Sequence, residues 1–309
     1  MPQEKRRLLV FGATGQLSQA LSRTDWPSGI AATFLDRAAA DLTKPDLMGR
    51  VVKEHAPDAV IIAAAYTQVD EAERDEEGAL AVNCASPTAI AAAAATHSAP
   101  VVYLSTDYVF DGTKAEAYRE ADPVGPVNSY GRSKLAGERG VKAANPRHLI
   151  LRTSWVYSAT GRNFLRAMVG AASSGQDVAT VVDQRGCPTA APDLAKAIGR
   201  IAPRLFAPDM PWGTYHLAGG SDATWHDFAE AIFMELAKRG FARPRNRAAL
   251  SAEMRRPARR PANSRLCCAA FADQFGFALP GFEDSMPAVL DELLGDPAFA
   301  VGAGRRRPT

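Results

Sequence analysis

The fold of this chain is decided by residues Leu8–Ser18, which read LLVFGATGQLS. The first four residues are all apolar, as expected of a strand buried on both faces, and a glycine follows at once. Glycines at a strand-to-helix turn let the backbone approach a pyrophosphate, and the following helix N-terminus offers it unpaired N–H groups. Because Gly12 and Gly15 follow the first strand, the stretch predicts a dinucleotide-binding turn, with Gln16 and Leu17 opening the helix beyond it.

Similar apolar runs recur through the first half of the chain and alternate with helix-forming segments. The expected strands are residues 8–11, 32–35, 59–63, 101–104 and 149–151, and an alanine-rich helix is expected over 87–97. Strands that are apolar throughout and separated by helices indicate a parallel sheet covered on both faces. The sequence therefore predicts an α/β fold with a doubly wound parallel sheet of the Rossmann type.

The second half of the chain has a different texture. Its expected elements are strands at 178–182 and 215–217, a helix over 225–239 capped by Thr224 and ended by Gly240, a Pro- and Arg-rich stretch over 243–265, and a short helix over 286–294. We predict a dinucleotide-binding domain over residues 1–158, with a return to it at about 178–218. A smaller C-terminal α/β substrate domain is expected over 159–177 and 219–295, and residues 296–309 are predicted to be disordered.

Composition restricts the classes of partner. The chain has 309 residues, 47% apolar and 23% charged, and a net charge of +2, which favours neither nucleic acid nor a membrane surface as partner. No apolar run approaches a transmembrane length, and the N-terminus lacks the pattern of a signal peptide. The four cysteines form no CxxC motif and the five histidines no metal-binding pattern, so we expect reduced thiols, a cytoplasmic protein and no metal site.

The end of the second expected strand carries two residues that favour opposite cofactors. Asp36 is placed to accept a bond from a ribose hydroxyl and to repel a 2′-phosphate, whereas Arg37 can pair with that phosphate. Asp41 and Leu42 are expected near the adenine, although Asp41 could equally cap a helix. Ser18 replaces the usual third glycine with another small residue. The two charged residues leave the choice between the cofactors open; NADPH is the expected cofactor and NADH is possible.

A tyrosine and a lysine one helical turn apart form the candidate reaction centre. Tyr130 and Lys134 lie on one face of an expected helix, so the ammonium is predicted to lower the pKa of the phenol toward neutrality. A phenol with such a pKa is an effective general acid or base. Thr106 follows a buried strand and is therefore expected at the carboxyl edge of the sheet, where ligands bind in such folds.

Several segments, in order, resemble the extended short-chain dehydrogenases and, more narrowly, the dTDP-4-dehydrorhamnose reductase family, which catalyses the last step of dTDP-L-rhamnose synthesis. The similarity covers residues 8–266, and its segments are GATGQL at 12–17, AAAYTQVD at 63–70, STDYVFDG at 105–112, YGRSKLAGE at 130–138, RTSWVY at 152–157, GRNF at 161–164, DQRGCPT at 183–189 and RPANSRL at 260–266. The Tyr–Lys pair is common to the whole superfamily, whereas the other segments together are typical of this reductase group.

The resemblance implies a role for each matching residue. Tyr130 is the implied proton donor to the C4 oxygen, Lys134 lowers its pKa and holds the nicotinamide ribose, and Thr106 bonds the same carbonyl. The implied cofactor residues are Gly12, Gly15, Gln16, Leu17, Asp36, Arg37, Asp41, Leu42, Ala63, Ala64, Ala65, Tyr66, Tyr130 and Lys134. The implied substrate residues are Thr67, Thr106, Asp107, Trp155, Asn163 and Arg260, the last chosen from an arginine cluster that suits a pyrophosphate.

The chain also departs from the family. Cys267 and Cys268 stand where polar residues are common, and Ala20 occupies a position that is acidic in members whose dimers are bridged by magnesium. We therefore predict that no metal bridges the dimer, and a homodimer as such stays open. The expected partner is a nucleotide diphosphosugar. Two other functions are kept: a regulatory subunit that binds dinucleotide without turnover, like the beta subunit of methionine adenosyltransferase, and another nucleotide-sugar reductase or epimerase.

Overall fold

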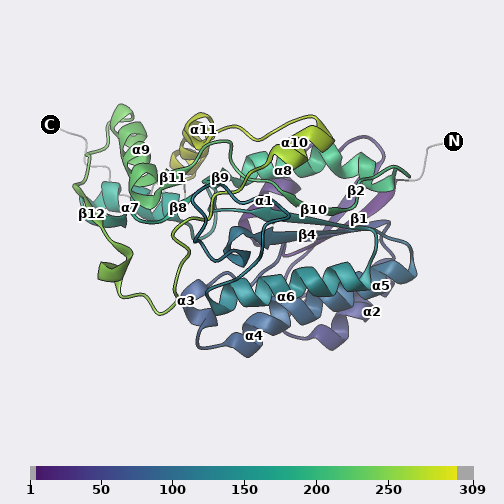
Figure 1. Ribbon diagram of the computed structural model, residues 1–309. Helices are drawn as coiled ribbons and strands as arrows, with labels where there is room; N and C mark the ends of the chain where they lie inside the picture. The colour runs from purple at the N-terminus through teal and green to yellow at the C-terminus, as the bar shows by residue number, and fades with distance from the viewer. Residues whose placement is uncertain (1–4, 298–309) are drawn as a thin grey trace.

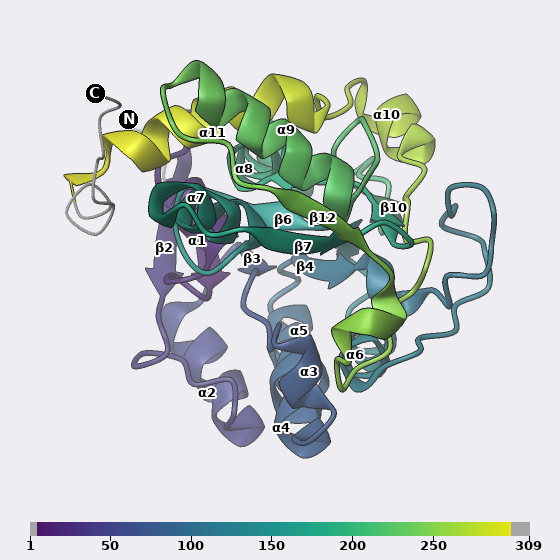
Figure 2. The ribbon, with the colours of Figure 1, turned by 90° about the vertical axis from the view of Figure 1, so that its left-hand side faces the viewer.

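A six-stranded sheet forms the centre of the computed structural model, which describes residues 5–297 (Figures 1 and 2). The strand order is β10-β5-β4-β3-β1-β2, and all neighbours run parallel. The strands are β1 (Arg6–Phe11), β2 (Ile30–Leu35), β3 (Ala59–Ile62), β4 (Val101–Thr106), β5 (His148–Thr153) and β10 (Gly213–His216). The doubly wound parallel sheet predicted from the sequence is confirmed.

Helices cover both faces of this sheet because its strands are apolar on both sides. In β1, Leu8 and Val10 pack into the core on one face, whereas Leu9 and Phe11 pack into the core on the other. The first core is covered by α1 (Gln16–Ser22), α8 (Ala191–Ile201) and α10 (Ala269–Phe275). The second is covered by α2 (Pro45–His55), α5 (Ser86–Thr96) and α6 (Ser129–Ala144). Figure 2 shows the resulting three layers, with α8 above the sheet and α2, α5 and α6 below it.

One continuous helical run crosses the lower layer. It consists of α4 (Glu76–Leu80), the π-helix η1 (Ala81–Ala85) and α5, and a short helix α3 (Val69–Ala72) precedes it. Within residues 5–297 it is the one helix long and apolar enough to cross a membrane by length and composition, a test that core helices also pass. Here it lies between α2 and α6, which both contact α5.

A second region packs beside the sheet around its own apolar core. Three two-stranded pairs belong to it: β7 (Val178–Val181) with β12 (Asn246–Ala249), β6 (Val156–Tyr157) with β9 (Thr189–Ala190), and β8 (Arg185–Gly186) with β11 (Ala223–Thr224). Its helices are α7 (Phe164–Ser174), α9 (Trp225–Lys238) and α11 (Phe282–Gly295). Leu165, Phe228 and Leu290 join these helices in one buried cluster. Three 3-10 helices complete the structure: η2 (Asp107–Val109), η3 (Ala202–Phe206) and η4 (Ser251–Met254).

Some expected elements differ in detail from the structure. β7 pairs with β12 and not with the central sheet, so the chain rejoins the sheet only at α8 and β10, later than the predicted return at about 178. α9 begins at the predicted cap, since Thr224 and Asp227 form a reciprocal capping box. The Pro- and Arg-rich stretch contains β12 and η4, which were not predicted from its composition. The tail predicted to be disordered lies almost wholly outside the described residues.

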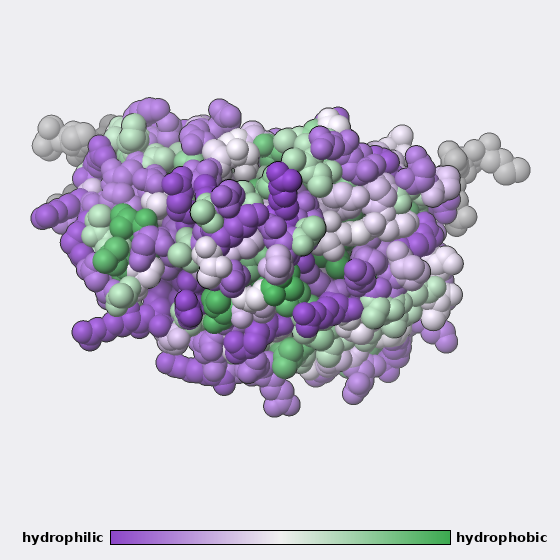
Figure 3. Space-filling model, in the orientation of Figure 1, coloured by the Kyte–Doolittle hydropathy of each residue, from purple (hydrophilic) through white to green (hydrophobic). Residues whose placement is uncertain are grey.

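The surface gives little sign of a large apolar contact area. On the face seen in Figure 3, apolar side chains form small separate patches among polar ones. Among the described residues, the large apolar side chains that are well exposed are Leu47, Leu80, Met234 and Leu250, which come from different parts of the chain.

Candidate functional site

The glycine turn after β1 is built for a close approach of backbone. Gly12 has φ +98°, and a Cβ placed on it would lie 2.7 Å from Cβ of Ala64. The Gly12 and Ala13 amides both donate to the Leu35 carbonyl at 2.9 Å, which fixes the turn. Gly15 is the N-cap of α1 and offers no side chain to its first amides. These amides therefore suit a pyrophosphate, and the tight turn that the sequence predicted fits a dinucleotide.

The residues that open α1 face in different directions. Leu17 packs into the core, so only its backbone is available to a ligand, and Ser18 is completely buried in the tight helix–sheet contact. Gln16 turns its amide toward the second region, where its Oε1 accepts hydrogen bonds from Ser158 Oγ and Asn163 Nδ2, both at 2.9 Å. The cofactor turn is thereby tied to the loop that precedes α7.

The end of β2 carries both of the charges that the sequence showed. Asp36 accepts a hydrogen bond from the Ala39 amide at 3.0 Å, and Arg37 pairs with Asp41 at 3.5 Å. The Arg37 side chain is 79% exposed, so this ion pair holds it weakly and leaves it free to reach a phosphate. Leu42 is buried in the lower core, and only its backbone can border an adenine.

A buried asparagine that the sequence reading missed supports the segment after β3. Asn83 lies in the π-helix η1; its Oδ1 accepts from the Tyr66 amide at 2.9 Å and its Nδ2 donates to the Tyr66 carbonyl at 3.0 Å. Nδ2 also donates to Ser133 Oγ on α6 at 2.9 Å. One side chain thus fixes the run Ala63, Ala64, Ala65, Tyr66 beside the glycine turn. A π-helical turn often marks a functional site, but no spacing in the sequence reveals it.

The reaction centre forms where β4 ends and α6 begins. Thr106 ends β4, while Tyr130 and Lys134 lie on α6, as predicted. The Thr106 hydroxyl accepts a hydrogen bond from the Tyr108 amide at 3.2 Å and lies within bonding reach of the Tyr130 phenol. α6 approaches η2 closely at Gly131, where a Cβ would lie 2.2 Å from the Tyr108 carbonyl oxygen. This contact sets the distance between the two hydroxyl-bearing elements.

The predicted effect of Lys134 on Tyr130 is not what the structure shows. Burial raises the pKa of Tyr130 to about 12, and the bond with Thr106 only partly opposes this rise. Lys134 is 1% exposed; its Nζ donates to the Leu104 carbonyl at 2.6 Å and lies 4.0 Å from the centre of the Tyr103 ring. Burial lowers the pKa of Lys134 to about 7, and the nearby Glu138 carboxylate opposes this. The expectation was wrong because burial is the largest influence on the pKa of each group, and Lys134 is not among the groups that shift the pKa of Tyr130.

Asp107 is a buried carboxyl directly beside Thr106. It is 2% exposed and accepts hydrogen bonds from Ser154 Oγ at 2.9 Å and from Thr106 Oγ1 at 3.0 Å. Burial raises its pKa to about 6, although the hydroxyls of Ser264, Ser154 and Thr106 all favour the carboxylate. Asp107 therefore links β4 to the β5–β6 connection and to the C-terminal segment, and it accepts the hydrogen bond of the Thr106 hydroxyl.

The other predicted substrate residues are spread around this centre. Trp155 follows Ser154 and stacks on Trp225 of α9, with ring centres 3.5 Å apart. Asn163 caps α7, and its side-chain Nδ2 donates to Gln16 Oε1 and to backbone carbonyls. Its polar atoms therefore already have protein partners. Arg260 makes a two-pronged ion pair with Asp70, at 3.0 and 2.8 Å. Thr67 lies exposed after β3. The predictions that these residues bind substrate stay predictions.

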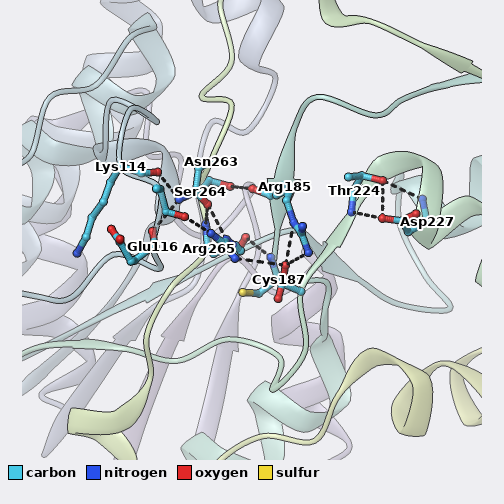
Figure 4. A network of polar contacts seen from close by, with 12 residues as sticks. Lys114, Glu116, Arg185, Cys187, Thr224, Asp227, Asn263, Ser264 and Arg265 are labelled. Carbon is cyan, nitrogen blue, oxygen red and sulfur yellow. Dashed lines mark hydrogen bonds and ion pairs between the residues drawn. The ribbon is translucent and has the colours of Figure 1, made fainter.

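A polar network fastens the C-terminal segment of the site to the rest of the molecule (Figure 4). Asn263 Nδ2 donates to the carbonyls of Lys114 and Glu116, both at 2.7 Å, while its Oδ1 accepts from the Arg265 backbone and guanidinium. The Ser264 amide donates to the Arg185 carbonyl at 2.8 Å. These contacts join the loop after β4, β8 and the segment that carries Arg260.

The surface where an acidic metal cluster was expected to be depleted contains ion pairs. Arg23, the C-cap of α1, bonds Glu292 of α11, and Lys196 lies 3.8 Å from Asp193. Among residues 5–297, no three His, Cys, Asp or Glu side chains gather in a way that could hold a metal ion. The absence of a bridging metal stays a prediction.

Comparison with known proteins agrees with this geometry. The family described as "RmlD substrate binding domain" matches residues 6–294. A "dTDP-4-dehydrorhamnose reductase" of Sinorhizobium fredii is 41% identical, covering 93% of this chain and 98% of the relative, and that of Salmonella typhimurium is 39% identical, covering 93% and 97%.

Solved structures agree as well. A dTDP-4-dehydrorhamnose reductase from Clostridium acetobutylicum superposes with a TM-score of 0.86 at 32% identity, and one from Bacillus anthracis in complex with NADP with a TM-score of 0.85 at 31%. In both cases the superposition covers 93% of this chain and 99% of the solved chain. A Thermus thermophilus UDP-glucose 4-epimerase, 20% identical with a TM-score of 0.77, shares the fold alone. The chain belongs to the dTDP-4-dehydrorhamnose reductase family.

Proposed function

We propose that this protein reduces the C4 ketone of dTDP-4-dehydro-6-deoxy-L-mannose to dTDP-L-rhamnose. The observation that carries the proposal is the placement of Thr106 and Tyr130 at the carboxyl end of β4, in the sheet whose β1 leads into the glycine turn. A nicotinamide dinucleotide, NADPH or alternatively NADH, supplies the hydride when bound. The protein then needs a group that polarises the ketone and a group that donates one proton to its oxygen.

Tyr130 is the proposed proton donor. With a pKa of about 12, its phenol carries a proton throughout the neutral range, as a donor in the reductive direction requires. Thr106 is the proposed second donor to the developing oxyanion. Its single hydroxyl proton is donated to Asp107 Oδ1 at 3.0 Å in this structure and would turn to the substrate oxygen when the ketone is bound. Lys134, whose ammonium donates to the Leu104 carbonyl and to no other group among residues 5–297, is proposed to hold the nicotinamide ribose. The remaining predicted cofactor residues line the glycine turn and the ends of β2 and β3.

The pyrophosphate of the substrate is proposed to lie near the Arg-rich segment before Arg260. Arg260 itself is 10% exposed and already bonds Asp70 with both terminal nitrogens, so its role is to fix the segment as much as to bind. Arg256 is exposed and forms no ion pair within the described residues, and its charge reaches both Asp70 and Tyr108. Arg256 is therefore the better candidate for a direct phosphate contact.

Two further expectations belong to the same proposal. A cytoplasmic location fits the four cysteines, which are all free. A homodimer without a bridging metal fits the ion pair between Arg23 and Glu292, which neutralises a carboxylate on that surface.

One assay tests the function against its alternatives. Purified protein is mixed with NADPH and the 4-keto sugar nucleotide, and the absorbance of reduced nicotinamide is followed. Loss of absorbance in a one-to-one ratio with dTDP-L-rhamnose formed supports the reductase. Isomerised sugar with no loss of absorbance and tightly retained NAD indicates an epimerase. Dinucleotide binding without turnover, together with a captured protein partner, indicates a regulatory subunit and would overturn the proposal.

A further inference from the structure

Two indole rings from distant parts of the chain form a parallel stack beside the reaction centre. Trp155 lies between β5 and β6, and Trp225 is the first residue of α9. Their ring centres are 3.5 Å apart and the planes differ by 5°, so Trp225 covers one face of the Trp155 ring. Ser154, the neighbour of Trp155, donates to Asp107 at 2.9 Å, which places this stack next to Thr106.

The backbone of Trp155 adopts a conformation that bulky residues rarely take. Its φ is +45°, in the left-handed region, and such strain persists only where the surroundings impose it. Two contacts hold it: the Thr189 amide donates to the Trp155 carbonyl at 3.2 Å, and the Cys187 amide donates to Ser154 Oγ at 3.2 Å. These hydrogen bonds therefore fix the backbone position of Trp155. The orientation of its ring plane must be fixed by the residues that contact the ring.

The ring of Trp155 is confined from two sides. On one side lies Gly186, where a Cβ would come within 2.3 Å of Trp155 Cε2, so any other residue would push the indole away. Gly186 pairs with Ala223 in the β8–β11 ladder, and that ladder leads directly into Trp225. The same ladder thus supplies both the slot for the Trp155 ring and the residue that stacks on it.

Trp225 is itself held in a fixed orientation. Its Nε1 donates to Gln184 Oε1 at 3.2 Å, and Gln184 Nε2 in turn donates to Ser251 Oγ at 2.7 Å. The Phe164 ring also contacts Trp225, with ring centres 4.6 Å apart and planes tilted by 49°. A hydrogen-bonded indole that contacts two further aromatic rings has little freedom, so it acts as a rigid support for its neighbour.

We infer that Trp225 is a positioning residue that sets the wall of the sugar pocket by holding the Trp155 ring in place. The inference rests on the proposed function and specifies which part of the ligand is concerned: the hexose ring of a nucleotide diphosphosugar, and neither its base nor the dinucleotide. Because Trp225 covers one face of Trp155 and Gly186 lies against the ring at Nε1, Cε2 and Cζ2, a sugar can contact only the part of the ring that neither of them covers.

The test compares Trp225→Ala, Trp225→Phe and Trp155→Phe with Trp212→Phe. Trp212 precedes β10 and lies at the opposite edge of the sheet, over Arg147, so it is the matched control. Binding of dTDP-L-rhamnose and of dTDP is measured by calorimetry, and the paired indoles are followed by their exciton couplet in far-ultraviolet circular dichroism. Steady-state KM and kcat for the 4-keto sugar nucleotide complete the set.

We expect Trp225→Ala to weaken dTDP-L-rhamnose binding and raise the sugar-nucleotide KM by about three- to tenfold, the range of one aromatic stack. The affinity for dTDP and the KM for NADPH should stay unchanged. Trp225→Phe should retain most of the wild-type affinity for dTDP-L-rhamnose, because it keeps an aromatic face. The couplet should vanish in all three variants that lack one of the stacked indoles and persist in Trp212→Phe. Equal affinity for dTDP-L-rhamnose in wild type and Trp225→Ala, or equal losses for dTDP and the sugar nucleotide, would overturn the inference.

The design separates the two levels of the proposal. If wild-type protein binds dTDP-L-rhamnose but shows no turnover, the proposed reductase function fails, whereas a selective loss of sugar affinity in Trp225→Ala still supports the inference. If Trp225→Ala does not fold, Trp225→Leu takes its place, since leucine keeps apolar volume but removes the aromatic face, and the same selective loss of sugar affinity is expected. A wild-type spectrum without the couplet contradicts the stack itself.

Discussion

The cofactor edge and the substrate edge of this molecule are built in different ways. The cofactor edge depends on backbone: a glycine turn after β1, an alanine run after β3, and a close approach of the two at Gly12 and Ala64. The substrate edge depends on side chains that meet across long stretches of sequence, such as Asp70 with Arg260 and Trp155 with Trp225. A backbone contact allows almost no alternative residue, whereas a side-chain contact allows graded replacement.

The difference also determines how damage should spread. A Cβ at the cofactor edge meets atoms that cannot move away, so we expect large and local losses there. At the substrate edge, one lost contact leaves several others, because the segment 258–266 is held by Asp70, Asn128 and the network of Figure 4. Between the two edges stand Thr106 and Tyr130, whose loss should affect chemistry more than binding, and Lys134, whose loss should also weaken cofactor binding.

The largest expected effect comes from removing the proton donor between the two edges. Tyr130→Phe should lower kcat by about 10²–10⁴, the usual contribution of a general acid, while leaving the affinity for NADPH nearly intact. Stopped-flow single turnovers and NADPH fluorescence titration measure the two quantities. Tyr108→Phe is the control, because its ring packs edge-to-face on Tyr130 at 5.8 Å and it keeps that contact. A normal single-turnover rate in Tyr130→Phe would show that another group donates the proton.

The pH dependence tests the charge state of Lys134. Since burial lowers its pKa to about 7, kcat/KM for NADPH, which reports the cofactor-free enzyme, should fall as the pH rises through 7 and approach a tenfold loss per unit. Lys134→Arg keeps its charge at all these values and should move the descending limb to higher pH, although at a lower plateau. A flat profile between pH 6 and 9 would mean that Lys134 stays charged or does not contribute.

A matched pair of glycines separates strain from contact at the cofactor edge. Gly12→Ala adds both an unfavourable φ of +98° and a clash with Ala64, whereas Gly29→Ala adds a similar φ of +92° with nothing within 4 Å. We expect Gly12→Ala to destabilise the protein by about 1–3 kcal/mol more than Gly29→Ala, and to weaken NADPH binding in addition. Urea unfolding and calorimetry measure this. Equal losses of stability and of NADPH affinity in the two variants would contradict the claim that the turn needs glycine for a close backbone approach at position 12.

Removing the buried charge of Asp107 should stabilise the protein and weaken its chemistry. Its folded pKa of about 6 lies above the unfolded value of 3.8, so burial of the carboxylate costs stability above pH 6 and nothing below pH 3.8. Asp107→Asn should therefore gain about 1–2 kcal/mol at pH 8 and little near pH 4, with a lower kcat because the amide offers Thr106 and Ser154 one acceptor oxygen instead of two. Denaturant unfolding of wild type and variant at pH 8 and pH 4 measures the two differences in unfolding free energy. A stability loss at pH 8 would indicate that the hydroxyl bonds outweigh desolvation.

The smallest effect is expected from the ion pair that joins the two regions. Asp70→Asn should cost about 0.5–1 kcal/mol of stability and raise the KM for the sugar nucleotide modestly, since the Arg260 segment keeps its other contacts. The bond with Arg260 holds the Asp70 pKa below its usual value, so the wild-type advantage should disappear as the solution is acidified below pH 4. Glu76→Gln, which breaks a pair with Arg132 inside the first region, is the control. Equal KM values for the sugar nucleotide in Asp70→Asn and Glu76→Gln would show that the Asp70–Arg260 ion pair has no role at the substrate edge.

The cofactor edge was largely predictable because its determinants are local. The run Leu8–Ser18 contains the strand, the turn and the helix start, and its glycines stand where the backbone needs them. The capping box of α9 was predictable for the same reason. Asn83 was not, because a single asparagine in an apolar helix has no periodic signal and acquires its role only when η1 packs against Tyr66 and Ser133.

The sequence by itself determined the parallel sheet, the position of the dinucleotide turn and the identity of the residues at the end of β4. These depend on alternation of apolar segments and on backbone freedom, which are properties of neighbouring residues. Only the tertiary structure decided the charge states and the pairings, including the high pKa of Tyr130, the low pKa of Lys134 and the stack of Trp225 on Trp155. Desolvation and packing depend on every element that surrounds a group, and spacing along the chain does not contain that information.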